Sequence, residues 1–538
     1  MNDWIVVISG NVCAGKTTLA EGLVTRFSVK HVTTSQCIRE LRPKVPRDRR
    51  ELQKAGAALD RETKGRWVAN ALAQRIDNEP RHQSLFALDC VRTAEQVSAL
   101  RRQFGQRIVH VHLTADRDEL SRRYLARTRT DIDELVSYEG VLADPVERAV
   151  PTLGAIADVI IDTQRCTERD VLLRAASHIG LLGRQYKRSV DVLVGGQYGS
   201  EGKGQVAAYL SPEYDMLVRV GGPNAGHKVW TETGPITFHH LPSGTTSNPV
   251  ARIVLGAGAV VRTEALLKEI RQFKVDSERL SIDPQAFVIS DADIETERNL
   301  RKAIGSTGQG VGAASARRIT ERSLARDSCA LAANDPQLKQ FIKPAGELLE
   351  DAYANGHRVM LEGTQGTALS LYHGDYPYVT SRETSVAGCL ADAGISPARV
   401  RRIVMVCRTY PIRVQSPHGG TSGEMSREIS WEEIARRSRI SLKEIRQTEK
   451  TSTTNRPRRV GEFDWSLLRS SASLNAPTDI ALTFVDYLNI SNRDAYRIDQ
   501  LDNVTQQFVE EVERVAMAPV SLLSVRFHAR AIIDRRRW

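Results

Sequence analysis

Residues 190–205 read VDVLVGGQYGSEGKGQ, an apolar run of strand length that enters a glycine-rich loop. Within this loop, Gly199, Gly202 and Gly204 allow the backbone to approach a bound phosphate closely. Lys203 adds a positive charge beside them. A strand followed by such a loop is typical of nucleotide-binding α/β proteins, so we expect the C-terminal two-thirds of the chain to form an α/β domain.

The same pattern occurs near the N-terminus, where residues 10–17 read GNVCAGKT and match the P-loop consensus GxxxxGK[ST] in full. An apolar run at Trp4–Ser9 precedes the loop, and Leu19 and Leu23 follow it at helical spacing. The lysine places a positive charge at the β- and γ-phosphates, and the threonine hydroxyl can hold Mg²⁺. The residues expected to bind the triphosphate are Gly10, Gly15, Lys16, Thr17 and Thr18, with Thr17 as the Mg²⁺ ligand.

Strand-like and helix-like segments alternate after the P-loop. Ser84–Leu88 and Ile108–Leu113 are apolar runs of strand length, and the second precedes a charged helical stretch at Asp116–Arg129. This alternation predicts a parallel sheet. We therefore expect two P-loop-type α/β domains, each with a mostly parallel central sheet flanked by helices. The expected boundaries are residues 1–183 for the first domain, 184–189 for a linker and 190–538 for the second domain.

The first domain carries further residues typical of phosphoryl transfer. His31–Ser35, followed by Arg39, looks like the acceptor-binding segment of nucleoside monophosphate kinases, and residues 1–180 resemble a small nucleotide or deoxynucleotide kinase. Asp89 ends a predicted strand and can hold a Mg²⁺-bound water or act as a base. Four arginines can form a lid over the transferring phosphoryl group or simply a solvated face: Arg122, Arg123, Arg127 and Arg129. The sequence leaves the acceptor of this domain open.

Composition narrows the class of protein. Of the 538 residues, 41% are hydrophobic and 26% are charged, values typical of a globular protein. No run approaches about 18 consecutive apolar residues and no secretory leader precedes the P-loop, which predicts a cytoplasmic protein without a membrane partner. Seven cysteines without a CxxC pair indicate reduced core thiols. The net charge of +10 suits phosphorylated ligands, and the even spread of lysine and arginine argues against nucleic acid.

The second domain carries a series of motifs after its first loop. They are GPNAGHK at 222–228, HLPSG at 240–244, GSTGQGVG at 305–312, EGTQGT at 362–367, HGDYPYVTS at 373–381, STTNRPRR at 452–459 and LTFVD at 482–486. In this order they resemble the motifs of the adenylosuccinate synthetase family, from residue 190 to about residue 530.

The resemblance implies an enzyme that joins L-aspartate to the 6-oxo carbon of a purine nucleoside monophosphate, driven by GTP or ATP with Mg²⁺. Phosphorylation of the 6-oxygen turns it into a leaving group, which the aspartate amine displaces. The family also implies a homodimer, in which Arg317 reaches the phosphate site of the neighbouring subunit. By resemblance the catalytic residues are Ser200, Lys203, His227 and Gln365. His227 is favoured over His240 and His373, which can also be core histidines.

Ligand-binding residues are implied in the same way. The purine nucleotide is assigned to Asn224, Thr307, Arg317, Gln365 and Thr380. L-Aspartate is assigned to Thr453, Thr454, Arg456 and Arg458, since arginine engages a carboxylate with two parallel hydrogen bonds. The triphosphate is assigned to Gly199, Gly202, Lys203, Gly204 and Asp486, and Mg²⁺ to Ser200 and Gly226.

Three positions depart from the family pattern. Ser200 stands where the family has the aspartate base, Gln309 where it has arginine, and Phe484 where it has lysine. Serine at this position resembles the phage 2-aminoadenylosuccinate synthetases, which use (d)GMP, and its short side chain leaves room for a 2-amino group. We therefore favour a (d)GMP-directed ligase, with an IMP-directed enzyme and a nucleotide-sensing pseudoenzyme as alternatives. Asp486 favours GTP as the donor, whereas Phe484 weakens that preference.

Overall fold

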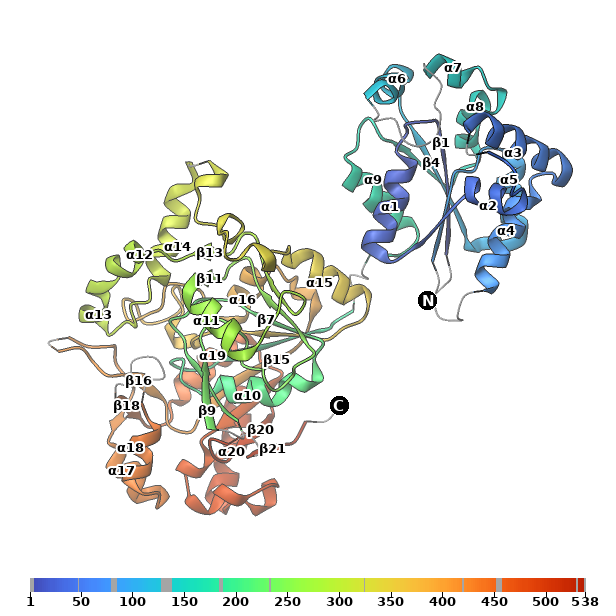
Figure 1. Ribbon diagram of the computed structural model, residues 1–538. Coiled ribbons are helices and arrows are strands. Elements are labelled where there is room, and N and C mark those ends of the chain that lie inside the picture. The colour runs from blue at the N-terminus through green and yellow to red at the C-terminus, as the bar shows by residue number, and fades with distance from the viewer. Residues whose placement is uncertain are drawn as a thin grey trace. The chain divides into compact units, whose positions relative to one another are not determined.

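A computed structural model describes residues 4–46, 48–78, 85–126, 138–182, 187–231, 234–323, 325–418, 420–450, 457–528 and 531–536. The chain divides into two compact units, an N-terminal unit (Met1–Gly183) and a C-terminal unit (Arg184–Trp538) (Figure 1). Each unit has a mostly parallel sheet with helices on both faces, which is the predicted fold class.

The N-terminal unit is built on a five-stranded parallel sheet in the order β2-β3-β1-β4-β5. Its strands are β1 (Ile5–Gly10), β2 (Lys30–Thr33), β3 (Phe86–Asp89), β4 (Ile108–Thr114) and β5 (Val159–Asp162). Its helices are α1 (Lys16–Phe27), α2 (Thr34–Leu41), α3 (Arg49–Thr63), α4 (Arg66–Asp77), α5 (Ala94–Phe104), α6 (Arg117–Ala126), α7 (Tyr138–Leu142), α8 (Pro145–Ala149) and α9 (Glu168–His178).

Two separate cores cover the faces of this sheet. Val6 and Ile8 of β1 pack with α1 and α9 on one face, and Ile5 and Val7 pack with α2, α4 and α5 on the other (Figure 1). A strand buried on both faces needs apolar residues at every position, which explains why this run does not alternate with polar residues.

The three predicted strands of this unit are present with shifted ends. β1 begins one residue later than predicted, β3 begins at Phe86, and β4 extends to Thr114. β2 and β5 are not predicted, because each is a four-residue edge strand with polar residues among the apolar ones. The predicted helix of residues 116–129 is α6, and residues 127–137 lie outside the described ranges.

The C-terminal unit is built on a nine-stranded sheet in the order β12-β10-β7-β14-β6-β15-β19-β20-β21, in which β21 alone pairs in the antiparallel direction. Its strands are β6 (Val190–Gly195), β7 (Met216–Arg219), β8 (His227–Thr231), β9 (Gly234–Phe238), β10 (Arg252–Leu255), β11 (Val260–Val261), β12 (Leu280–Ile282), β13 (Phe287–Val288), β14 (Val359–Glu362), β15 (Val400–Arg408), β16 (Ile412–Val414), β17 (Glu428–Ile429), β18 (Arg458–Gly461), β19 (Asp479–Thr483), β20 (Val520–Ser524) and β21 (Ile532–Asp534).

Helices pack on both faces of this sheet as well. They are α10 (Lys203–Leu210), α11 (Thr263–Phe273), α12 (Asp291–Thr296), α13 (Arg298–Ile304), α14 (Val311–Thr320), α15 (Ala345–Ala354), α16 (Val386–Ala393), α17 (Trp431–Ser438), α18 (Leu442–Thr448), α19 (Trp465–Asn475) and α20 (Asn503–Ala516). On the central strand β6, Val192 and Val194 pack with α15, α16, α19 and α20, whereas Leu193 packs with α10 on the opposite face. β8 and β9 form a hairpin beside this sheet, and β16, β18 and β17 form a small antiparallel sheet.

Two further observations bear on the sequence predictions. Among the described residues, no helix is long and apolar enough to span a membrane, and no group of three or more His, Cys, Asp or Glu side chains is arranged to hold a metal ion. Cys37, Cys389 and Cys407 are buried, but the other four cysteines are only half-buried. The expectation of core thiols is therefore wrong for those four.

Separate cores predict separate stabilities. Leu72 on α4 is fully buried in the N-terminal unit, so Leu72→Ala should lower the free energy of unfolding of that unit by about 2–5 kcal/mol. Calorimetry should show a lower transition temperature for the N-terminal unit and an unchanged transition temperature for the C-terminal unit. Leu125→Ala is the matched control, because Leu125 on α6 is 73% exposed. An equal shift of both transitions would contradict two independent cores.

Candidate active site

The carboxyl ends of the parallel strands meet at one edge of the C-terminal sheet. Gly195 ends β6 and leads into the glycine-rich loop, and Arg219, Glu362 and Arg408 end β7, β14 and β15. Ligands of open parallel sheets bind outside this edge. Residues that are more than a hundred positions apart in the sequence are therefore brought together here.

The glycine-rich loop is held by the carboxylate of Glu201, which is fully buried. Its Oε1 accepts hydrogen bonds from the backbone N–H groups of Gln197 (3.0 Å) and Gly199 (2.8 Å), and its Oε2 accepts one from Lys203 Nζ (2.7 Å). Ser200 joins this arrangement through its carbonyl, which accepts a hydrogen bond from Arg408 (3.3 Å). The position of the loop thus depends on Glu201 rather than on the side chain of Ser200.

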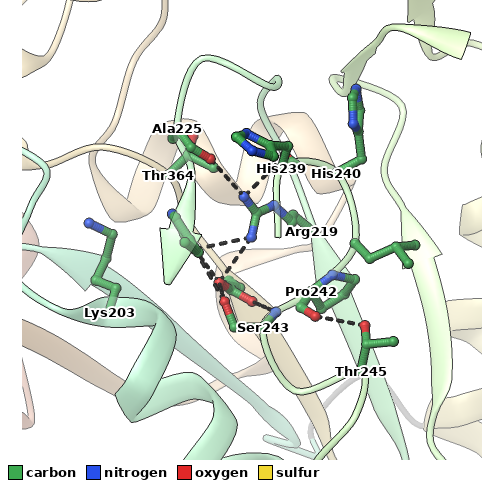
Figure 2. A network of polar contacts seen from close by, with 12 residues as sticks. Lys203, Arg219, Ala225, His239, His240, Pro242, Ser243, Thr245 and Thr364 are labelled. Carbon is green, nitrogen blue, oxygen red and sulfur yellow. Dashed lines mark hydrogen bonds and ion pairs between the residues drawn. The ribbon is translucent and has the colours of Figure 1, made fainter. Parts of the chain in front are cut away.

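A buried ionic network lies beside this loop (Figure 2). Arg219 Nη1 donates to Glu362 Oε1 (3.1 Å), and Arg219 Nη2 donates to the carbonyls of Ala225 (3.3 Å) and His239 (3.2 Å). Glu362 also contacts Nδ1 of His227 and accepts a hydrogen bond from the backbone N–H of Ser243 (2.8 Å). These contacts fix the ring of His227, whose Nε2 is buried without a partner.

The charges of this network decide the protonation of His227. Burial, followed by the charge of Arg219, lowers the pKa of His227 to about 4. Burial opposes ionisation of Glu362, but Arg219 and His227 outweigh it and lower the pKa of Glu362 to about 2. At neutral pH the imidazole is therefore neutral, with Nδ1–H directed at Glu362 and Nε2 left as an acceptor.

A cavity of about 530 Å³ opens in front of the loop and the histidine. The sequence-predicted residues that line it are Gly199, Ser200, Gly202, Lys203, Gly204, Gly226, His227, Arg458 and Asp486. Asp486 keeps Oδ1 buried without a partner, while Arg493 contacts its Oδ2 (3.2 Å). Burial raises the pKa of Asp486 to about 6, partly offset by Arg493, so it is mostly ionised at neutral pH and able to accept N–H donors.

The opposite wall of the cavity centres on Glu449, which is buried. Its carboxylate accepts hydrogen bonds from Arg408 (2.8 Å) and Tyr487 (2.9 Å) and contacts Arg458 (3.4 Å). The guanidinium of Arg408 also lies over the ring of Phe484, 4.0 Å from its centroid. An arginine therefore lies against the residue that replaces the family's lysine.

The predicted purine-binding residues form a chain of hydrogen bonds next to this cavity. Gln365 Nε2 donates to Asn224 Oδ1 (2.8 Å), Asn224 Nδ2 donates to Thr380 (3.4 Å), and the hydroxyl of Thr307 donates to the carbonyl of Asn224 (3.5 Å). A Cβ on Gly199 would lie 3.1 Å from Cα of Gln365, so the chain adjoins the loop. Oε1 of Gln365 is buried without a partner.

Arg317 lies apart from this chain, on α14. It donates from Nε and Nη2 to Asp293 (3.0 and 2.7 Å) and from Nη1 to Glu321 (3.3 Å). These contacts hold it within its own unit, so reaching a neighbouring subunit requires them to open. The predicted aspartate-binding residues Thr453, Thr454 and Arg456 lie outside the described residues.

The charged side chains that support the site were not among the sequence predictions. They are Glu201, Arg219, Glu362, Arg408, Glu449 and Arg493. Glu362 opens the EGTQGT motif and Glu201 lies inside the loop, so motif membership could have drawn attention to both. Arg219, Arg408 and Glu449 carry no such signal, because the sheet brings Arg219 and Arg408 to the site and Glu449 reaches it from the end of α18.

The N-terminal unit has its own cavity, of about 480 Å³, at the P-loop. Gly15, Lys16, Thr17, Thr18 and Asp89 line it, as predicted, together with His31 and Thr33–Ser35; Arg39 does not. Gly10 takes part through its carbonyl, since Lys16 Nζ donates to the carbonyls of Gly10 (2.8 Å) and Asn11 (2.7 Å). The hydroxyl of Thr17 donates to Asp89 Oδ2 (3.3 Å).

Only part of the predicted arginine lid can be placed. Arg123 donates to the hydroxyl of Thr163 (2.9 Å) and approaches the carbonyl of Cys13 in the P-loop (3.5 Å). Arg122 forms an ion pair with Glu119 (2.7 Å) on the surface of α6. Arg127 and Arg129 lie outside the described residues.

Comparison with known proteins identifies the family. The family model described as adenylosuccinate synthetase matches residues 192–333 and 325–493, more than half of the chain. The chain belongs to the adenylosuccinate synthetase family. A second family model, described as AAA domain, matches residues 9–137 and covers the P-loop. The protein is thus an enzyme that combines an adenylosuccinate synthetase-like ligase unit with a P-loop kinase-like unit.

Curated relatives match about two-thirds of this chain. Adenylosuccinate synthetases of Methanocaldococcus jannaschii and Pyrococcus horikoshii are each 34% identical to it over 353 residues, which is 64% of this chain and 96% and 98% of theirs. Among solved structures, succinoaminodeoxyadenylate synthetase of cyanophage S-2L, bound to dGMP and to dATP as an energy donor, is 26% identical, with a TM-score of 0.54, over 65% of this chain and 96% of its own. Adenylosuccinate synthetase of Plasmodium falciparum shares the fold, at 20% identity and a TM-score of 0.56, over 65% of this chain and all of its own.

Buried histidines make the stability of the synthetase unit depend on pH. Burial, followed by the charge of Arg219, lowers the pKa of His240 to about 3, and its Nε2 accepts a hydrogen bond from the backbone N–H of Arg262 (3.0 Å). The unfolded chain therefore binds more protons than the folded chain below pH 6.5, and stability falls as the pH is lowered. We expect a loss of roughly 2 kcal/mol from His240 between pH 6.5 and 5. His240→Gln should reduce this slope in urea unfolding at several pH values, and exposed His373→Gln should not. A slope unchanged by His240→Gln would contradict this assignment.

The two phosphate-binding loops should act independently. We expect Lys16→Ala to abolish ATP hydrolysis or phosphoryl transfer by the N-terminal unit while ligation stays measurable, because the C-terminal unit has its own Lys203. Both activities would be assayed on the same preparation. Loss of ligation in a folded Lys16→Ala protein would show that the sites are coupled.

Proposed function

We propose that the C-terminal unit condenses L-aspartate with the 6-oxo carbon of GMP or dGMP, through a 6-phosphoryl intermediate, to give a 2-aminoadenylosuccinate nucleotide. The observation that carries this proposal is Ser200, which lines the cavity at the position of the family's aspartate base. A hydroxyl is smaller than a carboxylate and leaves space beside N1 of the purine. A 2-amino group can occupy that space.

Glu201 cannot take over the role of the missing aspartate. Its two oxygens already accept hydrogen bonds from Gln197, Gly199 and Lys203, and the residue is fully buried. Using it as a base would break the contacts that shape the loop. This argues against a neighbouring carboxylate as a substitute base for IMP.

Gln365 supplies a partner for the guanine edge. Its Nε2 is bound to Asn224, which leaves the buried, unpartnered Oε1 as the acceptor. Guanine offers N1–H and a 2-amino group as donors, whereas hypoxanthine offers N1–H alone. A buried acceptor therefore favours the base with more donors.

His227 acts on the 6-oxygen. Its Nε2 is an acceptor in the neutral ring and becomes a donor on protonation, which the negative charges of the bound phosphates favour. Glu362 holds Nδ1–H and so fixes the ring while charge develops. Lys203 adds a fixed positive charge at the transferring phosphoryl group, and Arg458 offers a guanidinium to a carboxylate of L-aspartate.

The residues present also fit Mg²⁺. In the C-terminal cavity Ser200 and Gly226 offer oxygen atoms, and in the N-terminal cavity Thr17 offers its hydroxyl, which lies 3.3 Å from Oδ2 of Asp89. Oxygen ligands completed by substrate phosphates are what Mg²⁺ prefers. When bound, the ion neutralises phosphate charge during transfer.

Other features support the proposal and its extensions. The cyanophage structure that resembles this chain contains dGMP, which supports a guanine acceptor. Asp486 suits the N–H donors of guanine in GTP, while the dATP of the cyanophage enzyme makes ATP or dATP the competing donor.

A homodimer through the C-terminal unit and phosphoryl transfer in the N-terminal unit belong to the same proposal. The second candidate is ligation of IMP, which the 34% identity to adenylosuccinate synthetases favours.

Ser200 should control the choice of purine. We expect the wild-type protein to have a higher kcat/KM for GMP or dGMP than for IMP, and Ser200→Asp to shift the ratio toward IMP by roughly 5- to 150-fold, because a carboxylate fills the space of the 2-amino group. Ligation with each nucleotide would be followed by chromatography of the products.

Ser200→Ala is the control for this substitution, because it removes the hydroxyl but keeps the space, and it should retain the preference for (d)GMP. A wild-type preference for IMP, merely accelerated in Ser200→Asp, would leave adenylosuccinate synthesis as the function.

A further inference from the structure

The acceptor side of the N-terminal cavity is formed by residues outside the P-loop. Asp60 on α3, Trp67 on α4, Gln96 on α5 and Arg92 line it, opposite Lys16. Trp67 Nε1 donates to Asp60 Oδ1 (2.7 Å), and Gln96 Nε2 donates to both oxygens of Asp60 (2.9 and 3.0 Å). The carboxylate of Asp60 is therefore held in a fixed position at the wall of the cavity.

The charges on this side do not suit a second phosphate. Arg92 is bound to Glu147, which is 3% exposed, so part of its hydrogen-bonding capacity is already used. Among the described residues, no lysine or arginine forms an ion pair with Asp60 or Asp89; Nε2 of His31 lies 3.7 Å from Oδ2 of Asp89. A phosphate monoester carries up to two negative charges and would face these two carboxylates, and Arg92 is the one arginine among the described residues that line the cavity.

The same carboxylates suit an uncharged acceptor. A carboxylate accepts about four hydrogen bonds, and Asp60 receives its contacts from only two donor groups, Trp67 and Gln96. Further acceptor capacity is left for N–H or O–H groups of a ligand. The N1–H and 2-amino groups of a 6-oxopurine are such donors, and the hydroxyls of Thr33, Thr34 and Ser35 also line the cavity.

We propose that the N-terminal unit phosphorylates an uncharged 6-oxopurine nucleoside, not a nucleoside monophosphate, and so makes the monophosphate that the C-terminal unit consumes. The second half of this statement rests on the proposed function of the C-terminal unit. A fused kinase could either make the monophosphate for the ligase or convert that monophosphate to a diphosphate. Because the acceptor side does not suit a phosphate, we infer that the kinase makes the monophosphate. The two reactions are linked by a diffusing product and require no contact between the units.

The chemical step balances with ATP as the donor. The 5′-hydroxyl oxygen of the nucleoside forms a bond to the γ-phosphorus, and the bond from that phosphorus to the β,γ-bridging oxygen breaks. Asp89 Oδ1, buried and without a partner, takes the hydroxyl proton. The products are a nucleoside 5′-monophosphate and ADP, and Lys16 stabilises the charge on the phosphates as they separate.

Acceptor choice is tested on the full-length protein with ATP and Mg²⁺. Guanosine, deoxyguanosine and inosine are compared with GMP, dGMP and IMP, and products are separated by ion-exchange chromatography. We expect the nucleosides to give monophosphates and the monophosphates to give no diphosphates. Formation of diphosphates, or phosphorylation of none of the three nucleosides, would overturn the proposal.

The link between the two reactions is tested in one vessel. Nucleoside, ATP, GTP, Mg²⁺ and L-aspartate should give the ligated product with the wild-type protein and not with Lys16→Ala, whereas added monophosphate should restore the product in the variant. Ligation from nucleoside by Lys16→Ala would refute the link. If the wild-type protein fails to ligate any added monophosphate, the proposed function of the C-terminal unit is wrong, and nucleoside phosphorylation still decides the acceptor.

The role of Asp60 is tested by Asp60→Asn. This change keeps the side-chain volume and removes the charge, and we expect kcat/KM for the nucleoside to fall roughly 10- to 100-fold through KM, with KM for ATP unchanged. Glu62→Gln is the matched control, because Glu62 lies on the same helix in an exposed pair with Arg42 (2.6 Å). An equal effect of both variants, or an equal rise in KM for ATP, would show that Asp60 has only a structural role.

Discussion

The carboxylate of Glu201 is the constraint on which the ligase site depends. Moving a carboxylate and an ammonium group out of water costs free energy that offsets much of their mutual attraction. The buried pair of Glu201 and Lys203 is stable because further hydrogen bonds satisfy the carboxylate. Those bonds come from the backbone N–H groups of Gln197 and Gly199. The loop therefore has one geometry, in which Lys203 begins α10 at the carboxyl edge of the sheet. Removal of either partner would leave a buried charge, at a cost of about 3–5 kcal/mol.

The sequence predicts the loops of both units and the alternation of strands and helices, because phosphate binding restricts the backbone to glycine at particular positions. It does not predict the charged side chains that support the site. Arg219 and Glu362 are 143 positions apart and meet because β7 and β14 pair in parallel. Arg408 ends β15, and Glu449, which is 41 positions later, follows α18. Short edge strands such as β2 escape prediction for a related reason, since half of their surface faces away from the core.

The two cavities differ in charge, and this difference follows the ligands that each must hold. Among the described residues, six lysines and arginines and three acidic residues line the C-terminal cavity, an excess that suits the triphosphate, monophosphate and dicarboxylate of the proposed function. The N-terminal cavity has Lys16 for the donor phosphates, but its acceptor side presents Asp60 and Asp89. A glycine-rich loop with a lysine lines both cavities. The acceptor is set by residues that the P-loop motif does not contain.

The position of Ser200 explains how substrate choice can change without loss of the fold. Its neighbour Glu201 holds the loop through contacts with Gln197, Gly199 and Lys203. Ser200 contributes only its carbonyl, which contacts Arg408. The side chain of residue 200 is therefore free to vary between a base and a space-making hydroxyl. Oε1 of Gln365 is buried without a partner, and under the proposed function it faces the purine whichever side chain stands at position 200. Under the proposed function, selectivity can thus reside in the side chain of Ser200, because Glu201 holds the loop.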